Sequence, residues 1–177
     1  MDLNLGELLQ RVARGELSAA EAETILSAST ETNLGFARVD LDRLRRRGLA
    51  EVIFCPGKTA DQIVNIMSAL VAGGQNVLAT RATPEQYAVV CQAHAQAVYH
   101  ALPKAITLRV VEPGSPVGQV AVVCAGTSDI PVAEEAALTA EVMGARVERI
   151  YDVGVAGLHR VLSHVETLKS SRAVVVV

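Results

Sequence analysis

A chain of 177 residues is long enough for one domain, or two small ones, with a buried core. Its net charge of -3 and pI near 5.8 argue against nucleic-acid binding, which usually needs a basic face. Three scattered cysteines argue against a disulfide scaffold or a zinc site. No signal-peptide pattern or membrane-length apolar stretch is visible, so we expect a cytoplasmic protein without membrane contact.

Residues 1–48 are expected to form a helical segment. The capping box that begins at Ser18 and ends at Glu21 predicts a helix, and two helices joined near Gly15 account for residues 3–28. Residues 34–47 predict the entry of a strand followed by a short helix. The basic cluster at 43–47 is interpreted as a solvated helix end, or as phosphate or subunit contacts, rather than a nucleic-acid site.

Residues 49–112 are expected to form a small α/β domain. Apolar runs predict strands at 52–55, 76–80 and 105–111. A capping box that starts at Thr59 predicts the first intervening helix, and Pro84 at the first helical position after Thr83 predicts the second. The segment 113–118, rich in proline and glycine, is the expected linker.

Residues 119–177 begin a second βα series. The sequence predicts strands at 120–124, 146–151 and 172–177, with helices at 131–143 and 158–168. This alternation predicts a parallel sheet, about half of a doubly wound α/β domain. Because the chain stops on its last strand, we expect it to be part of a longer protein, and to aggregate or need a partner if made alone.

The loop at residues 125–129 follows the first of these strands and enters a helix. Gly126 allows close backbone approach, and Thr127 and Ser128 place hydroxyl groups beside unpaired helix N-H groups. A phosphate or a ribose is the expected ligand. The alternative is that Ser128 or Asp129 only caps the helix.

The loop at residues 151–160 follows the neighbouring strand and is the second candidate. It brings Asp152, Gly154, His159 and Arg160 to the same edge of the sheet. His159 can carry a proton near neutral pH, and Arg160 can hold a carboxylate or a phosphate. A structural role for His159 is an equally weighted alternative.

Two cations in the first α/β domain are further candidates for anion binding. Lys58 lies at a predicted helix start, and Arg81 follows a predicted strand. Gly57-Lys58-Thr59 is not a P-loop, because Val52 occupies the position of the first glycine of that motif. Cys55 and Cys124 end strands and are expected to be small buried thiols.

Residues 122–136 and 151–160, together with 51–59 and 76–82, closely resemble the LarB family of nickel-pincer nucleotide cofactor biosynthesis. The last third of the chain is also similar, more distantly, to the PurE class of aminoimidazole ribonucleotide carboxylases. These likenesses imply a PurE-like, flavodoxin-type domain at 119–177, incomplete at its carboxyl end. By comparison with the carboxylases, Ser128 and Asp129 fall on a nucleotide-binding loop and His159-Arg160 lie beside the CO2 site.

The resemblance implies a specific reaction. The pyridinium ring of nicotinic acid adenine dinucleotide is carboxylated with CO2, and its phosphoanhydride is hydrolysed to give a pyridinium biscarboxylate mononucleotide and AMP. Asp129 and His159 are then the expected catalytic residues. The expected substrate-binding residues are Gly126, Thr127, Ser128, Asp152, Gly154, Arg160, Lys58 and Arg81.

The expected accessory groups and partners follow from the same resemblance. We expect no tightly bound cofactor, with CO2 as co-substrate and Mg2+ as a candidate for the hydrolysis. The expected ligand is the dinucleotide or an AMP-like nucleotide, and the expected assembly is a homo-oligomer, an octamer by resemblance. Family members carry a cysteine nucleophile beyond the valine strand, a position that Cys55, Cys91 and Cys124 do not occupy. The alternative is a noncatalytic nucleotide-binding or regulatory module.

Overall fold

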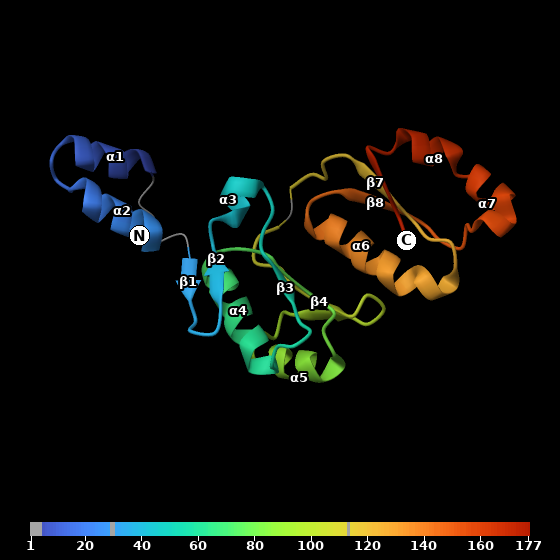
Figure 1. Cartoon of the computed structure of the whole chain (residues 1–177), viewed down its shortest axis with the longest axis horizontal. Coiled ribbons are helices and arrows are strands. Elements are labelled where there is room, and N and C mark those ends of the chain that lie inside the picture. Colours follow the sequence, from blue (N-terminus) through green and yellow to red (C-terminus); the bar gives the residue numbers. More distant parts are fainter. Residues whose placement is uncertain (1–4, 29–30, 113) are drawn as a thin grey trace.

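The computed structural model describes residues 5–28, 31–112 and 114–177 and confirms the α/β class. Figure 1 shows three regions in chain order: a pair of helices at one end, a mixed sheet in the middle, and a parallel sheet at the other end. The two sheets lie on either side of helix α6 (Ile130–Val142), which contacts both.

The first region is a pair of helices, as expected from the sequence. Helices α1 (Leu5–Ala13) and α2 (Ala19–Ala28) are joined by a turn in which Gly15 has a φ of 70°. The capping box is confirmed: the Ser18 N-H donates to Glu21 Oε2 at 2.8 Å, and the Glu21 N-H donates to Ser18 Oγ at 3.2 Å. Leu8 and Ala22 are buried in this pair.

A small antiparallel hairpin follows. It consists of β1 (Glu31–Asn33) and β2 (Arg38–Asp40). The expected strand and short helix correspond to β2 and α3 (Arg43–Arg47), whereas β1 was not expected because its three polar residues show no apolar alternation. Asp42 accepts from Arg45 at 2.6 Å, which fits the interpretation of this basic cluster as a solvated helix end.

The central sheet has the strand order β3-β4-β6-β5. Its strands are β3 (Val52–Phe54), β4 (Val77–Thr80), β5 (Val98–His100) and β6 (Ala105–Leu108). The pair β3–β4 is parallel, whereas β6 runs antiparallel to both of its neighbours. Strand β5 was not predicted, and it is defined by its pairing with β6.

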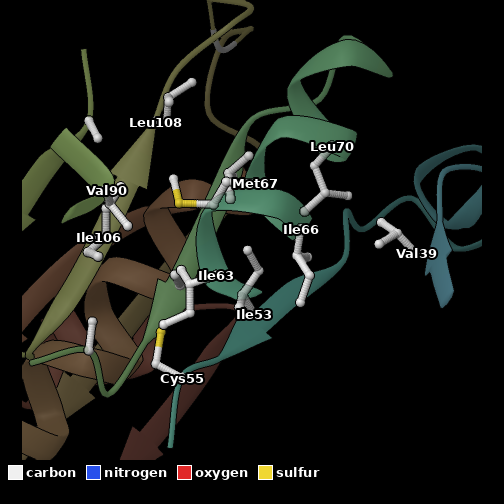
Figure 2. Packing of buried hydrophobic residues seen from close by; sticks show 14 residues of the cluster. Val39, Ile53, Cys55, Ile63, Ile66, Met67, Leu70, Val90, Ile106 and Leu108 are labelled. Atoms are coloured by element: carbon white, nitrogen blue, oxygen red, sulfur yellow. The ribbon is translucent and has the colours of Figure 1, made fainter. Parts of the chain in front are cut away.

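One face of this sheet is covered by α4 (Ala60–Ala72) and α5 (Pro84–Ala93). Both helices begin where expected, and the capping box at Thr59 is confirmed. The structure adds a second capping box, in which Thr83 exchanges hydrogen bonds with Gln86. Figure 2 shows Ile63, Met67 and Leu70 of α4 packed toward the sheet. Fully buried apolar side chains of this kind dominate the stability of the region.

The third region is a parallel sheet of order β8-β7-β9. In chain order after the linker its elements are β7 (Gln119–Val123), α6, β8 (Arg146–Ile150), α7 (Leu158–Leu162), α8 (Val165–Ser170) and β9 (Ala173–Val176). Helix α6 covers one face through Ala133 and Ala137, and the other face packs against Val161 and Leu168. Strand β9 is exposed along its whole length.

The single helix expected at 158–168 is two short helices instead. The break occurs where the Ser163 hydroxyl donates to the Arg160 carbonyl at 2.6 Å and the His164 N-H donates to the Val161 carbonyl at 3.1 Å. Bonds to the residue three positions back tighten the turn and end α7.

Candidate functional site

The two candidate loops lie side by side at the carboxyl ends of β7 and β8. Three backbone hydrogen bonds join them: Cys124 N-H to the Ile150 carbonyl at 3.1 Å, Val153 N-H to the Cys124 carbonyl at 3.2 Å, and Gly154 N-H to the Ala125 carbonyl at 3.0 Å. Parallel neighbouring strands end at the same edge of a sheet, and this is where ligands bind in open α/β sheets. The loops therefore form one continuous surface.

Gly154 lies at the closest approach between the two loops. A Cβ atom at this position would lie 3.0 Å from the carbonyl oxygen of Ala125, which is tighter than most contacts of real Cβ atoms. With a larger residue here, the Ala125 backbone would have to shift by a few tenths of an ångström. Gly154 is thus needed for the geometry of the surface, in addition to any contact with a ligand.

The first loop is closed by the carboxylate of Asp129. Its Oδ2 accepts from the Gly126 N-H at 3.0 Å, and its Oδ1 accepts from the Ser128 hydroxyl at 3.3 Å. Residues Thr127–Asp129 form one turn of 3-10 helix that leads into α6. No side chain caps the α6 amino end, so the expected alternative of a simple cap is not the arrangement found. Thr127 and Ser128 are exposed.

The second loop is closed by an ion pair. Arg160 Nη1 donates to Asp152 Oδ2 at 2.8 Å and to the Asp152 carbonyl at 3.1 Å. Asp152 has a φ of 57°, a left-handed conformation that is uncommon outside glycine. The His159 side chain is exposed, and its ring has no hydrogen-bond partner within the described ranges. The structure therefore brings Asp152, His159 and Arg160 to the same edge as Ser128.

An anchor that sequence reasoning missed fixes the start of the second loop. Glu134 of α6 accepts from Arg149 Nε at 3.1 Å and from the Tyr151 hydroxyl at 3.0 Å. Burial and the Glu134 carboxylate raise the pKa of Tyr151, so its hydroxyl stays protonated and donates. The sequence could have indicated this anchor through the i, i+2 spacing of Arg149 and Tyr151. In a strand this spacing places both side chains on one face, here the face that α6 covers.

Lys58 and Arg81 lie at the carboxyl ends of the other parallel pair, β3 and β4. Lys58 Nζ donates to the Phe54 carbonyl at 2.7 Å, and the Arg81 guanidinium lies 5.6 Å from the centre of the Phe54 ring. Arg81 Nε also pairs with Glu135 of α6 at 3.4 Å. Arg81 is thereby joined to the helix that follows the first loop, whereas the Lys58 carbonyl accepts from Gln86 Nε2 of α5 at 3.0 Å.

The three cysteines do not supply an activated thiol at these loops. Cys55 and Cys124 are buried, as expected, and burial raises the pKa of Cys55 to about 11. Cys124 lies beneath the first loop with its sulfur 3.6 Å from the Gly126 carbonyl. Cys91 lies on α5, where its thiol donates to the Ala88 carbonyl at 3.3 Å.

Over the part of the chain that the structure describes, no three His, Cys, Asp or Glu side chains gather as a metal-binding group. The carboxylates of Asp129 and Asp152 are each engaged in the hydrogen bonds given above, so these residues do not fit a protein-built Mg2+ site. In the same ranges, every helix is too short or too polar to cross a bilayer.

An apolar hollow of about 290 Å³ lies elsewhere, at the amino ends of the central strands. Val52, Leu78 and Met143 are among its lining residues. It lies at the carboxyl end of α6, whereas the first loop enters the amino end of this helix, and its lining is mostly apolar. We therefore place the candidate site at the loops.

Comparison with known proteins places part of the chain in a family. Residues 31–110 match the family described as the LarB/PurE-like N-terminal domain. The chain is also 34% identical over 167 residues to "Uncharacterized protein MJ0165" of Methanocaldococcus jannaschii. That match covers 90% of this chain and 65% of the relative, so the chain spans just under two thirds of the relative's length. The match supports a LarB-like identification, with residues 31–110 similar to the LarB/PurE-like N-terminal domain.

Proposed function

We propose that this chain contributes the nucleotide site of a carboxylase that acts on nicotinic acid adenine dinucleotide. The observation that carries the proposal is the pair of hydrogen-bonded loops at the carboxyl ends of β7 and β8. They present the hydroxyls of Thr127 and Ser128 beside the amino end of α6, a favourable setting for phosphate. On the neighbouring loop they present His159 and Arg160.

Each part of the site has a chemical task in this reaction. The first loop binds the phosphates of the dinucleotide, with Asp129 holding the loop closed through Gly126 and Ser128. Arg160 neutralises a carboxylate or a phosphate while Asp152 orients its guanidinium. Lys58 and Arg81 add positive charge at the neighbouring sheet edge.

The proposed carboxylation replaces a ring carbon-hydrogen bond with a carbon-carboxylate bond and releases one proton. His159 is the proposed acceptor of that proton, because its imidazole is exposed beside the loop and is free of hydrogen bonds within the described ranges. Hydrolysis then consumes one water molecule, which supplies the oxygen that separates AMP from the mononucleotide. We derive no step through a metal ion.

A second function, a noncatalytic nucleotide-binding module, is favoured by the state of the thiols. Covalent activation of the pyridinium ring needs an accessible thiolate. Cys55 and Cys124 are buried, the pKa of Cys55 is raised to about 11, and Cys91 is on a different helix, α5. For this chain we therefore assign no nucleophile and retain binding without chemistry as the alternative.

The remaining parts of the proposal concern the cell and the assembly. We place the protein in the cytoplasm, with CO2 as co-substrate and without nucleic-acid or membrane partners. A homo-oligomer is proposed from the resemblance, and the exposed edge strand β9 offers a surface that association would cover.

The test combines binding and turnover on the same protein. Calorimetric titration with the dinucleotide is expected to show binding that Ser128→Ala weakens. Incubation with the dinucleotide and labelled bicarbonate is then analysed by mass spectrometry for a carboxylated product and AMP. Both products support the enzyme, binding without products supports the noncatalytic module, and absence of binding removes both.

A further inference from the structure

The outer face of α6 runs from the first loop toward Arg81. Val132, Glu135 and Thr139 follow one another at helical spacing on this face, and Ser128 lies one turn before Val132. The rise from Asp129 to Glu135 is about 9 Å, since each helical residue adds about 1.5 Å. A ligand held by its phosphate at Ser128 and lying along this face therefore reaches Arg81.

A shallow groove of about 350 Å³ occupies this face. Its lining residues are Arg81, five residues of α6 (Val132, Glu135, Ala136, Thr139 and Ala140) and Met143, which follows the helix. Val132 is 52% exposed and Met143 is 42% exposed, so the floor offers apolar surface to a ligand. A flat apolar group fits such a floor better than a compact anion does.

Arg81 is held at the rim of the groove in a fixed position. Its backbone has a φ of 54°, and the next N-H, that of Ala82, donates to the Lys104 carbonyl at 2.6 Å. Its guanidinium lies over Phe54, and Nε pairs with Glu135. Within the described ranges neither Nη group donates a hydrogen bond, and the side chain is 58% exposed. A guanidinium held in this way can stack on a second aromatic ring.

We propose that this groove binds the adenylate half of the dinucleotide, an inference that rests on the proposed function. The adenine base stacks on the Arg81 guanidinium, on the side not used by Phe54, and lies over the apolar floor. The Glu135 carboxylate accepts from the ribose hydroxyls, the role that an acidic residue has in many dinucleotide sites. The phosphate remains at Thr127 and Ser128. The first α/β domain thereby completes a site that begins in the second.

The test compares ligands that differ only in the base. Calorimetry is performed with AMP and with ribose 5-phosphate on the unaltered chain and on Arg81→Gln, Arg81→Lys and Arg43→Gln. Because stacking contributes about 1–3 kcal/mol per base, Arg81→Gln is expected to weaken AMP binding about tenfold or more. Binding of ribose 5-phosphate is expected to change by less than about twofold.

The two other variants separate stacking from charge and from folding. Arg81→Lys retains the positive charge that pairs with Glu135 but lacks a planar group, so it is expected to lose AMP affinity about as Arg81→Gln does. Arg43→Gln removes an exposed arginine from α3, outside the groove, and is expected to bind AMP normally. If AMP affinity is unchanged in both Arg81 variants, or falls equally for both ligands, the proposal is wrong.

Nicotinic acid mononucleotide distinguishes a failure of this inference from a failure of the proposed function. If it binds and AMP binds without dependence on Arg81, the adenylate groove is overturned while the proposed function stands. If AMP binds through Arg81 but the mononucleotide does not bind, the groove stands and the dinucleotide function is overturned. Absence of binding by both ligands overturns both.

Discussion

Two of the parallel strand pairs that the structure describes, β3–β4 and β7–β8, end in similar residues but differ in what surrounds them. The first pair belongs to a mixed sheet closed by the antiparallel strands β6 and β5. A tight turn follows β3 and leads to the helix that Thr59 caps. In this turn Lys58 Nζ donates to the Phe54 carbonyl. The second pair belongs to a parallel sheet with an exposed edge, β9.

The decisive difference lies in the loops. After β7 and β8 the chain forms two longer loops that hydrogen-bond to each other through Gly154 and Ala125 and leave the Ser128 hydroxyl exposed. Polar residues occur at both edges of the described sheets. The loops of the second edge are joined by backbone, whereas at the first edge the Gln86 side chain donates to the Lys58 carbonyl at 3.0 Å. Loop geometry, more than residue type, therefore makes a sheet edge a candidate site.

The largest expected effect tests the difference in packing between the two sheets. Ile63→Ala removes a fully buried side chain from the central core and is expected to lower the free energy of unfolding by about 2–5 kcal/mol. The control is Val176→Ala in β9, where the side chain is 73% exposed, with an expected change within about 0.5 kcal/mol. Urea denaturation measures both. Equal losses would show that β9 is as well packed as the core.

The next prediction concerns the contact between the loops. Gly154→Ala places a methyl group 3.0 Å from the Ala125 carbonyl, and the resulting shift is expected to cost about 1–3 kcal/mol and to weaken nucleotide binding. Gly114→Ala is the matched control, because a Cβ there meets open space. Thermal denaturation and calorimetry measure the two effects. If Gly154→Ala binds the nucleotide normally, the contact between the loops is not needed for the ligand site.

A smaller effect is expected from the carboxylate that closes the first loop. Asp129→Ala removes the acceptor for the Gly126 N-H and the Ser128 hydroxyl, and we expect a loss of about 1–2 kcal/mol. Glu166→Ala removes a carboxylate that is 91% exposed and should change stability by about 0.5 kcal/mol or less. Denaturation curves that coincide for the two variants would contradict the structural role of Asp129.

The smallest effect concerns Cys55, which ends β3 as Cys124 ends β7. Burial raises the pKa of Cys55 from its ordinary 9.0 to about 11, so the folded state favours the protonated thiol. The stability from this group is present below pH 9 and is lost as the pH rises through about 11. Between pH 9 and about pH 11, the melting temperature of Cys55→Ala is expected to fall less than that of the unaltered chain. An unchanged profile would contradict a buried, protonated thiol.

Much of the fold was predictable because the relevant signals are local. A capping box at Thr59 and a proline after Thr83 marked two helices, and continuous apolar runs marked β4, β7 and β9. Strands β1 and β5 were missed because they are defined by pairing with partners elsewhere in the chain. The break between α7 and α8 depends on hydrogen bonds that residue type alone does not specify.

The candidate site was predictable to a similar degree. The rule that parallel strands end at one edge predicted that the Ser128 and His159 loops are neighbours. The contacts of Glu134 with Tyr151 and of Arg81 with Glu135 were not predictable, since both depend on how α6 packs. Tertiary packing selects such partners among several exposed charges of suitable sign.

The most direct test of the central claim is an NMR titration of the isotopically labelled chain with nicotinic acid adenine dinucleotide. Backbone amide shifts are followed residue by residue. We predict that the largest changes occur at residues 126–129 and 152–160, with a second group at Arg81. Changes confined to the apolar hollow around Val52, or no changes at all, would contradict a nucleotide site at the paired loops.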